Sequence, residues 1–316
     1  MKQNFAIVIS KYYASRCIAL IESILKFDVN IYVLCFDKET SRIINKKIIS
    51  KKIITIEYAN ILNFDKSLKK IIKKRKLIDK IVTSRPIFIK YVLKKFNTKN
   101  IFLLDSDIYF FSNPNLLKKH IKNSSVAFCK HNFTKNNQEL SDKYGKYNGG
   151  FVYVKKDQNG KKFLGEWSKL CKKWCEFDSK DGKFSDQKYL ENLSLKIKNL
   201  KILNVPEINL APWNIEDKKI ELKRKQIYVN NKKLIFFHFH GLRKITKRFY
   251  ILGLENYSFV ISNKIKKIIF YKYAKRLSEI SSIKEYFWKK NNFFSRLLKI
   301  NVVFMKIYNN DYLILL

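Results

Sequence analysis

The chain has 316 residues, of which 46% are hydrophobic, so it can bury the core of one large α/β domain with an appendage and is not a disordered chain. Its formal net charge of +40 favours anionic partners, which include nucleic acid, anionic lipid and phosphorylated substrates. The five cysteines contain no Cys-x-x-Cys pair, so no zinc site is expected and free thiols in a reducing cytoplasm are predicted. The apolar runs are too short for a signal peptide or a transmembrane helix, so neither is expected.

The N-terminal part of the chain alternates between strand and helix patterns. Short apolar runs at 5–9, 31–36 and 53–56 predict buried strands, and apolar residues at helical spacing predict a helix over 14–27. This order predicts a parallel sheet in a nucleotide-binding α/β domain. Because there is no Gly-x-Gly-x-x-Gly motif and no Walker loop, phosphates are expected to be held by a metal ion and side chains.

Two helices are predicted before the next strand. A lysine-rich helix is expected over 65–80, with a solvated face. A second helix is expected from Ser84 to Phe96, with Pro86 in its first turn, where proline is tolerated.

A buried strand over 101–104 ends in Asp105-Ser106-Asp107. An extended backbone would point the carboxylates of Asp105 and Asp107 to the same side, beyond the carboxyl end of the strand, where α/β sheets bind ligands. Two oxygen ligands at that place suit Mg²⁺ or Mn²⁺. The alternative is that the tripeptide is only a polar turn that closes the strand.

The segment Asn148-Gly149-Gly150 precedes an apolar strand over 151–154. Paired glycines at such a position indicate that a ligand or another chain segment approaches the backbone closely. The alternative is a hairpin turn.

The pair Asp186 and Gln187 follows Ser185 at a predicted helix start. A carboxylate and an amide at this position can both be presented to a sugar. The alternative is structural, with Ser185 as the N-cap of a helix that begins at Asp186, whose charge complements the positive helix end.

A predicted hairpin, with Asn230-Asn231 at its turn, runs into the segment His238-Phe239-His240-Gly241-Leu242-Arg243-Lys244. The two histidines are spaced by two residues and are followed by two cations. This pattern fits a metal ligand with groups that neutralise phosphate.

The composition changes after about residue 254. Residues 255–316 hold 12 basic and 4 acidic residues, interleaved with aromatic and aliphatic side chains. This pattern predicts a basic amphipathic helical extension that lies on an anionic membrane surface. The alternative is a helical cap on the main domain with a solvated basic face.

Four motifs follow one another along the chain: Asp-x-Asp after a strand, Asn-Gly-Gly before a strand, Asp-Gln at a helix start, and His-x-x-Gly-x-x-Lys. In this order they resemble the motifs of the retaining GT-A-fold glycosyltransferases, family eight in particular. The last pattern is matched in full by His238, Gly241 and Lys244. The resemblance covers 5–244 and implies an α/β GT-A domain over 1–254, followed by the extension 255–316.

The resemblance also implies roles for individual residues. Asp105, Asp107 and His238 would hold Mn²⁺ (or Mg²⁺) on the diphosphate of a nucleotide-sugar, and Asp186 and Gln187 would act at the donor sugar. The other implied substrate-binding residues are Tyr13 on the base, Arg85, Asn148, Gly149, Gly150 and Gly241 around the donor, and Lys244 on phosphate. The chain departs from the family where Ser10 and Lys11 replace the usual carboxylate for the base, and where no Pro-Trp follows Lys244.

The function expected from this resemblance is the metal-dependent transfer of a hexose-type sugar, with retention, from a nucleotide-diphosphosugar to an acceptor hydroxyl. A UDP-sugar is the favoured donor, and the acceptor would be a glycan or glycolipid of lipopolysaccharide, capsule or another surface glycan. The enzyme would be cytoplasmic and peripheral on the membrane through 255–316, with no nucleic-acid partner.

Three alternatives stay open. The first is an inverting GT-A transferase with Asp186 as the general base. The second is a basic nucleic-acid-binding protein, which the charge and the aromatic content would fit. The third is a catalytically inactive GT-A scaffold.

Overall fold

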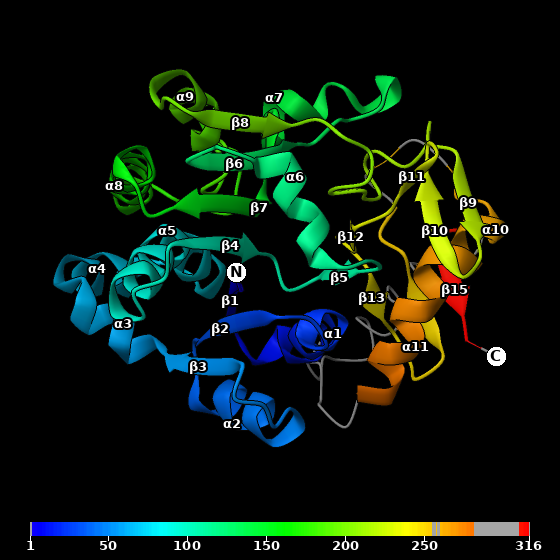
Figure 1. The fold of residues 1–316 in the computed structure, drawn as a ribbon, viewed down its shortest axis with the longest axis horizontal. Coiled ribbons are helices and arrows are strands. Elements are labelled where there is room, and N and C mark those ends of the chain that lie inside the picture. The colour runs from blue at the N-terminus through cyan, green and yellow to red at the C-terminus, as the bar shows by residue number, and fades with distance from the viewer. Residues whose placement is uncertain (1, 255–256, 258–259, 281–309, 316) are drawn as a thin grey trace, which may run out of the picture.

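The computed structural model describes residues 2–254, 257, 260–280 and 310–315 (Figure 1). Much of the predicted basic extension, residues 281–309 above all, therefore lies outside the described residues.

The central element is a seven-stranded sheet with the order β3-β2-β1-β4-β7-β6-β8. Its strands are β1 (Gln3–Ile9), β2 (Val29–Cys35), β3 (Ile53–Glu57), β4 (Asn100–Leu104), β6 (Val126–Lys130), β7 (Tyr147–Lys155) and β8 (Leu200–Leu203). β7 runs antiparallel to β4 and β6, and the other neighbours pair in parallel. This mixed sheet confirms the predicted α/β class.

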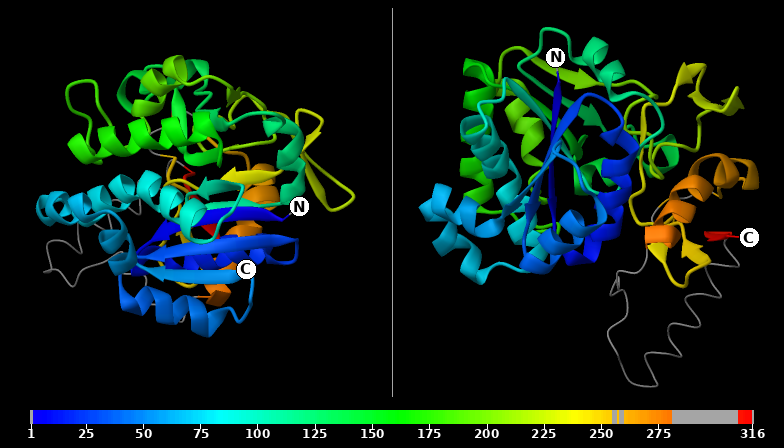
Figure 2. Two further views of the ribbon diagram at one scale, coloured as in Figure 1. Left: turned by 60° about the vertical axis from the view of Figure 1, so that its left-hand side comes forward. Right: turned by 60° about the horizontal axis from the view of Figure 1, so that its bottom comes forward.

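Helices cover both faces of the sheet, as Figures 1 and 2 show. Alternation along β1 explains the two layers, because Phe5, Ile7 and Ile9 belong to one core cluster and Ala6 to the other. The first cluster includes α1 (Ala14–Leu25), α2 (Lys38–Lys47) and α6 (Leu117–Ile121). The second includes α3 (Tyr58–Phe64), α4 (Lys66–Ile71), α5 (Leu77–Lys95), α8 (Gln158–Lys173) and α9 (Tyr189–Lys196).

Smaller strand pairs complete the molecule beside the first cluster. β5 (Ile108–Phe110) pairs antiparallel with β12 (Phe236–His238), which brings two segments far apart in the sequence together beyond the end of β4. The remaining strands are β9 (Ile220–Lys223), β10 (Gln226–Val229) and β11 (Lys232–Lys233) in one small sheet, and β13 (Arg243–Lys244), β14 (Phe249–Ile251) and β15 (Tyr312–Ile314) in another. A short α7 (Leu140–Tyr144) lies before β7.

The described part of the C-terminal region packs on the first core cluster. It consists of α10 (Asn263–Ile265), the π-helix Lys266–Phe270, α11 (Tyr271–Ile280) and β15. Tyr273 and Leu277 of α11 are buried in the same cluster as Phe5, and Arg276 forms a two-point ion pair with Glu22 of α1, with its Nε 2.6 Å from Oε2. The division at 254 stays a prediction.

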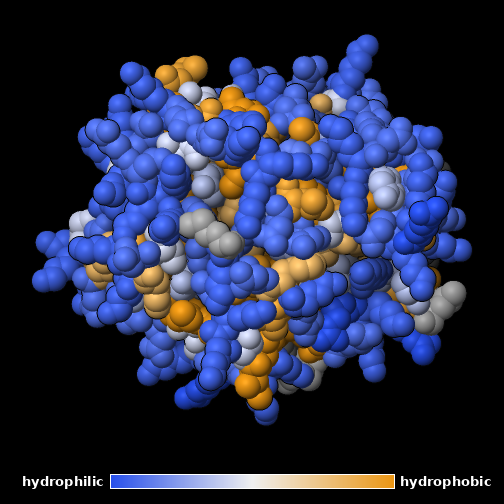
Figure 3. All heavy atoms as spheres, in the orientation of Figure 1, coloured by the Kyte–Doolittle hydropathy of each residue, from blue (hydrophilic) through white to orange (hydrophobic). Residues whose placement is uncertain are grey.

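Within the described residues, none of the helices combines the length and the apolar composition needed to cross a bilayer. The face drawn in Figure 3 is mostly hydrophilic, with apolar side chains gathered toward its centre and lower edge. All five cysteines are free and buried.

Two predicted helix boundaries are wrong. Pro86 lies inside α5 and not in its first turn, because α5 starts at Leu77 and burial of the preceding turn outweighs the preference of proline for a helix start. The lysine-rich helix predicted over 65–80 is interrupted at Arg75, which is extended and donates hydrogen bonds to the carbonyls of Cys171 and Lys172 at the end of α8.

The predicted helix start at Asp186 is also wrong. α9 begins at Tyr189, and Ser185 has a positive φ of 51°, so its side chain does not cap the helix. The Ser185 hydroxyl instead donates to the Asp186 carboxylate at 3.1 Å. The predicted hairpin forms only in part, because β10 pairs with the two-residue β11 and the chain then leaves to pair with β5.

Candidate active site

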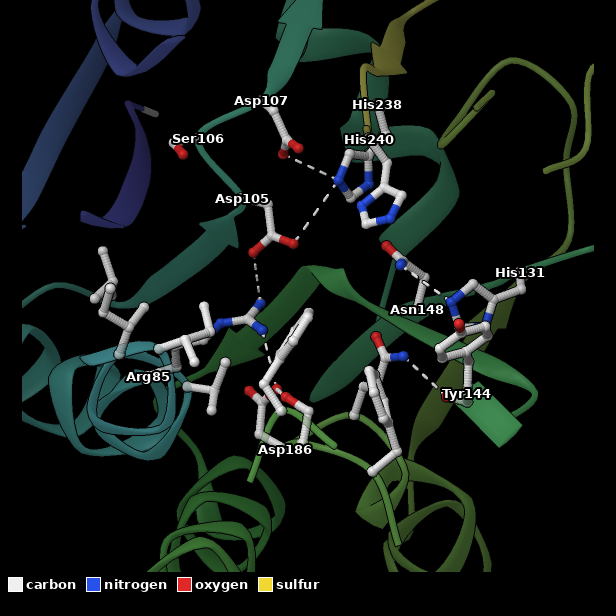
Figure 4. Close-up of a pocket in the computed structure, with 18 of the residues that line it drawn as sticks. Arg85, Asp105, Ser106, Asp107, His131, Tyr144, Asn148, Asp186, His238 and His240 are labelled. Atoms are coloured by element: carbon white, nitrogen blue, oxygen red, sulfur yellow. Dashed lines mark hydrogen bonds and ion pairs between the residues drawn. The ribbon is translucent and has the colours of Figure 1, made fainter. Parts of the chain in front are cut away.

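A cavity of about 430 Å³ opens beyond the carboxyl ends of β1 and β4, where the predicted site residues gather (Figure 4). The cavity is lined by residues of five segments: the loop after β1, α5, and the ranges 131–148, 177–187 and 213–240. This is the place where open α/β sheets bind their ligands.

The Asp-Ser-Asp tripeptide lies at the floor of this cavity. β4 ends at Leu104 and the tripeptide is a turn before β5, so the extended backbone considered above is not what brings the two carboxylates together. Two backbone hydrogen bonds fix the turn: Asp105 donates to the Gly150 carbonyl at 2.9 Å, and the Asp107 carbonyl accepts from the Phe239 amide at 2.8 Å. The tripeptide is therefore a turn, and it is also the candidate metal site.

His238 lies beside the tripeptide. β12 pairs with β5, and the His238 amide donates to the Leu210 carbonyl at 2.8 Å, which fixes the backbone from both sides. The His238 Nε2 atom is 3.0 Å from Asp107 Oδ1 and 3.8 Å from Asp105 Oδ2. Burial lowers the pKa of His238, but the carboxylate of Asp107 outweighs burial and the pKa is raised overall. The same contact holds the pKa of Asp107 well below its ordinary value despite burial.

The donor set beside the tripeptide fits a divalent cation. One ligand atom each from Asp107, His238 and His240 lies within 4.8 Å of the others, and the Nδ1 atom of His238 is buried without a hydrogen-bond partner. Carboxylate oxygen and imidazole nitrogen are both ligands of divalent first-row metals.

Arg85 connects the tripeptide to the opposite wall. From the middle of α5 its Nη2 atom is 3.1 Å from Asp105 Oδ1, its Nη1 atom is 3.1 Å from Asp186 Oδ1, and it also donates to the Gly149 carbonyl. Its side chain is only 7% exposed. Although burial lowers the pKa of the guanidinium, the two carboxylates raise it above its ordinary value, so the cation is secure.

Asp186 is fully buried, and its environment differs from that of Asp107. Burial raises the pKa of the Asp186 carboxyl to about 6, and the opposing effect of Arg85 does not cancel it. Its Oδ2 atom has no hydrogen-bond partner, and the indole of Trp167 donates to its backbone carbonyl at 2.9 Å. An unsatisfied buried carboxylate oxygen at the wall of a cavity marks Asp186 as a candidate functional group.

The Asn148-Gly149-Gly150 segment lies within β7, so the hairpin alternative is wrong. The glycines allow close approach: a Cβ on Gly150 would lie 2.6 Å from His238 Cε1 and 2.9 Å from Asp105 Oδ2. The Gly149 amide donates to Gln187 Oε1 at 3.2 Å, and the Gln187 amide group donates to the Tyr144 carbonyl at 2.9 Å.

His131 also lines the cavity, although no motif in the sequence selects it. Its Nδ1 atom is 2.7 Å from the Gly145 carbonyl and its Nε2 atom is 3.2 Å from the Asn148 side-chain nitrogen. An Nδ1 atom that donates leaves Nε2 as the acceptor, which turns the Asn148 oxygen toward the Gly150 amide at 3.0 Å. Burial lowers the pKa of His131 to about 3, so the ring stays neutral.

The remaining predicted residues lie at or beyond the rim. Tyr13 lines the cavity, is 39% exposed and packs against the guanidinium of Arg16. Gly241 and Lys244 do not line the described cavity. Gly241 has a φ of 79° and packs tightly on Gly253, so it shapes a turn, and Lys244 lies in β13, paired with Tyr250 of β14.

Comparison with known proteins gives the family. The model of the nucleotide-diphospho-sugar transferase family matches residues 26–240. Two uncharacterised proteins of Bacillus subtilis (strain 168) are similar: YfnD is 24% identical over 78% of this chain and 79% of its own length, and YfnF is 27% identical over 78% and 84%. Among solved structures, mouse xyloside xylosyltransferase 1 is 12% identical, with a TM-score of 0.46 over 67% of this chain and 88% of its own. The chain belongs to the nucleotide-diphospho-sugar transferases, and it is a GT-A-type glycosyltransferase that uses a nucleotide-sugar donor.

Proposed function

We propose that the enzyme transfers a hexose-type sugar, with retention, from a nucleotide-diphosphosugar to an acceptor hydroxyl, and that a UDP-sugar is the donor. The observation that carries the proposal is the pair of contacts that Arg85 makes, 3.1 Å to Asp105 and 3.1 Å to Asp186. They bring a carboxylate suited to a metal-bound diphosphate and a carboxylate suited to a sugar into one cavity.

Asp105, Asp107 and His238 are the proposed ligands of Mn²⁺ or Mg²⁺. When bound, the ion supplies Lewis-acid stabilisation of the negative charge on a diphosphate leaving group. The side chains themselves contribute a prepared site, because the backbone bonds at Asp105 and Asp107 hold them before any ligand arrives.

On the sugar side, Asp186 and Gln187 are the proposed groups that position the donor. The unpartnered Oδ2 atom of Asp186 accepts from a sugar hydroxyl, and Gln187 is held by Tyr144 and Gly149. Asn148, oriented by His131, adds an amide to the same wall. Tyr13 at the rim would stack on the base, and Lys244 with Gly241 would approach the phosphates after a rearrangement of the segment around β13.

An inverting transferase is the second candidate, since one observation favours it. Burial raises the pKa of Asp186 to about 6, which is close to the range where a carboxylate works best as a general base. NMR of the product decides between the two, because retention and inversion give opposite anomeric configurations.

The proposed acceptor is a glycan or glycolipid of lipopolysaccharide, capsule or another surface polysaccharide. The basic composition of 255–316 supports an enzyme that works in the cytoplasm at an anionic membrane surface. Flotation of the full chain with anionic and with neutral vesicles measures this association directly.

The test of the function is calorimetry of the purified full chain with UDP-, GDP-, CMP- and dTDP-sugars, with and without Mn²⁺. One donor is expected to bind in the presence of metal, and the double variant Asp105→Ala/Asp107→Ala is expected to lose that binding. Glu216→Ala/Asp217→Ala, which removes two exposed acidic side chains that do not line the cavity, is the matched control for charge removed elsewhere.

If no nucleotide-sugar binds with metal, the donor-site proposal fails. Salt-sensitive binding of RNA or DNA that is unchanged by Asp107→Ala would then support the nucleic-acid-binding alternative. Donor binding without turnover on any acceptor would support the inactive scaffold.

A further inference from the structure

The segment His238-Phe239-His240 carries two imidazoles toward the Asp-Ser-Asp turn. His238 is the last residue of β12, and His240 lies in the turn that follows it. The two rings have their centroids 6.2 Å apart, at an interplanar angle of 88°, and both line the cavity (Figure 4). Ligand atoms of Asp107, His238 and His240 all lie within 4.8 Å of one another.

The surroundings hold both rings in place. The indole of Trp213 packs edge-on against His238 at 5.1 Å and against His240 at 5.9 Å. The indole is itself fixed, because its Nε1 atom donates to the His131 carbonyl at 2.7 Å. A packed aromatic neighbour of this kind limits the rotation of both imidazoles, so little ordering remains when an ion binds.

The backbone of the segment is tied to the carboxylates directly. The Phe239 amide, between the two histidines, donates to the Asp107 carbonyl at 2.8 Å. His238 pairs with Ile108, the residue after Asp107, in the β12–β5 ladder. The three ligands therefore belong to one hydrogen-bonded unit rather than to separate loops.

Asp105 stands apart from this unit. One of its oxygens is engaged by Arg85 at 3.1 Å, and the other is 3.8 Å from His238 Nε2. Its charge is thus shared with the guanidinium, whereas Asp107 is paired with His238 at 3.0 Å.

We infer that His240 is a direct ligand of the metal ion, and that the ion is held by two imidazoles and the Asp107 carboxylate, with Asp105 as a further oxygen ligand shared with Arg85. The inference rests on the proposed metal-dependent function and adds to its ligand set. Its consequence is selectivity. Mg²⁺ prefers oxygen ligands, whereas imidazole nitrogen favours later first-row metals, so the site discriminates against Mg²⁺.

The test measures binding of metal alone to the full chain, in the absence of nucleotide. Calorimetry with Mg²⁺, Mn²⁺ and Co²⁺ is expected to give at least tenfold tighter binding of Mn²⁺ and Co²⁺ than of Mg²⁺. The variant His240→Asn is expected to lose at least tenfold in Co²⁺ affinity, because removing even an outer-shell partner of a metal ligand costs about 10–100-fold. The visible spectrum of bound Co²⁺, which reports its nitrogen ligands, should change in the same variant.

His120→Asn is the matched control, because His120 lies in α6 beside Glu207, away from the cavity. It is expected to bind all three metals as the wild type does. Circular dichroism checks that both variants are folded. Any one of three results would overturn the inference. They are equal affinities for Mg²⁺ and Mn²⁺, an unchanged Co²⁺ affinity and spectrum in His240→Asn, and no metal binding in the absence of nucleotide.

This failure is distinguishable from a failure of the proposed function. Metal binding that depends on His240, in a protein that binds no nucleotide-sugar, would leave the inference standing and remove the function. If donor binding depends on metal and His240→Asn changes neither this binding nor the metal selectivity, the proposed function stands. His240 is then not a ligand of the metal ion.

Discussion

At the scale of single residues, the candidate site contains two carboxylates in opposite electrostatic states. Asp107 faces a histidine, which lowers its pKa, while Asp186 is buried so deeply that its pKa rises to about 6 even with Arg85 beside it. The first is a permanent anion. The second takes up a proton in mildly acidic solution, so it can respond to pH near neutrality.

This difference predicts a pH-dependent stability. The folded-state pKa of Asp186, about 6, lies above the ordinary value of 3.8. The folded protein therefore binds this proton more tightly than the unfolded chain, and the resulting stability is fully present below pH 4 and is lost as the pH rises through 6. Asp186→Asn resembles the neutral form at every pH. Relative to the wild type, the variant should gain on the order of 3 kcal/mol of unfolding free energy between pH 4 and pH 7.

Chemical denaturation of both proteins at a series of pH values measures this gain. Taking the difference between the two proteins cancels the other carboxylates. A difference that is flat from pH 4 to pH 7 would show that Asp186 has an ordinary pKa.

At the scale of elements, the close packing of β7 on the Asp-Ser-Asp turn depends on Gly150. A Cβ there would lie 2.6 Å from His238 and 2.9 Å from Asp105, so Gly150→Ala must displace both side chains. We expect a loss of about 1–3 kcal/mol of stability, as for other overpacked interiors, together with loss of metal and donor binding in calorimetry.

Gly165→Ala is the comparison for this prediction. Gly165 lies inside α8, and a Cβ there meets no atom within 4 Å. Alanine should stabilise the helix by about 0.5–1 kcal/mol and leave binding unchanged. Unaltered binding in Gly150→Ala would contradict the close approach that the structure describes.

Sequence patterns anticipated the strands and the gathering of the motifs better than the helix boundaries. Short apolar runs identified β1, β2, β3, β4 and β7 but not β8, and the order of the motifs indicated that Asp105, Asn148, Asp186 and His238 would meet in one cavity, as they do. Local rules failed where tertiary contacts compete with them, as at Pro86, where burial of the preceding turn extends the helix.

His131 could not be selected from the sequence, because it belongs to no motif. Its partners are the Gly145 carbonyl and Asn148, and β6 and β7 shift register between Phe128 and Cys129, two residues before it. A β-bulge of this kind re-aims side chains next to a site, and no periodicity reports it. Lys244 illustrates the opposite case: its motif is matched in full, yet it lies in β13, outside the lining of the cavity.

At the scale of the whole molecule, an ion pair joins the described C-terminal helix to the first helix. Arg276 of α11 contacts Glu22 of α1 with two nitrogens, and both side chains are about one-third exposed. Solvent screens such a pair, so a double-mutant cycle with Arg276→Met and Glu22→Gln should give a coupling energy of only about 0.5–1 kcal/mol, decreasing at high salt.

The matched control is Glu279→Gln. Glu279 also contacts Arg276, at 2.7 Å, but lies in the same helix, so its removal leaves the connection between α11 and α1 intact. A coupling of several kcal/mol, insensitive to salt, would mean that burial of α11 and the ion pair act as one unit.

The hydrogen bond between the Phe239 amide and the Asp107 carbonyl also has a consequence for the order of events during synthesis. Every strand of the seven-stranded sheet has left the peptidyl-transferase centre once Leu203 is made, whereas His238 and His240 follow later. At translation rates of about 5–20 residues per second, the interval lasts on the order of seconds. During it, the nascent chain carries the carboxylates of the turn without their imidazole partners, so the proposed ion is acquired only after His238 and His240 have been made.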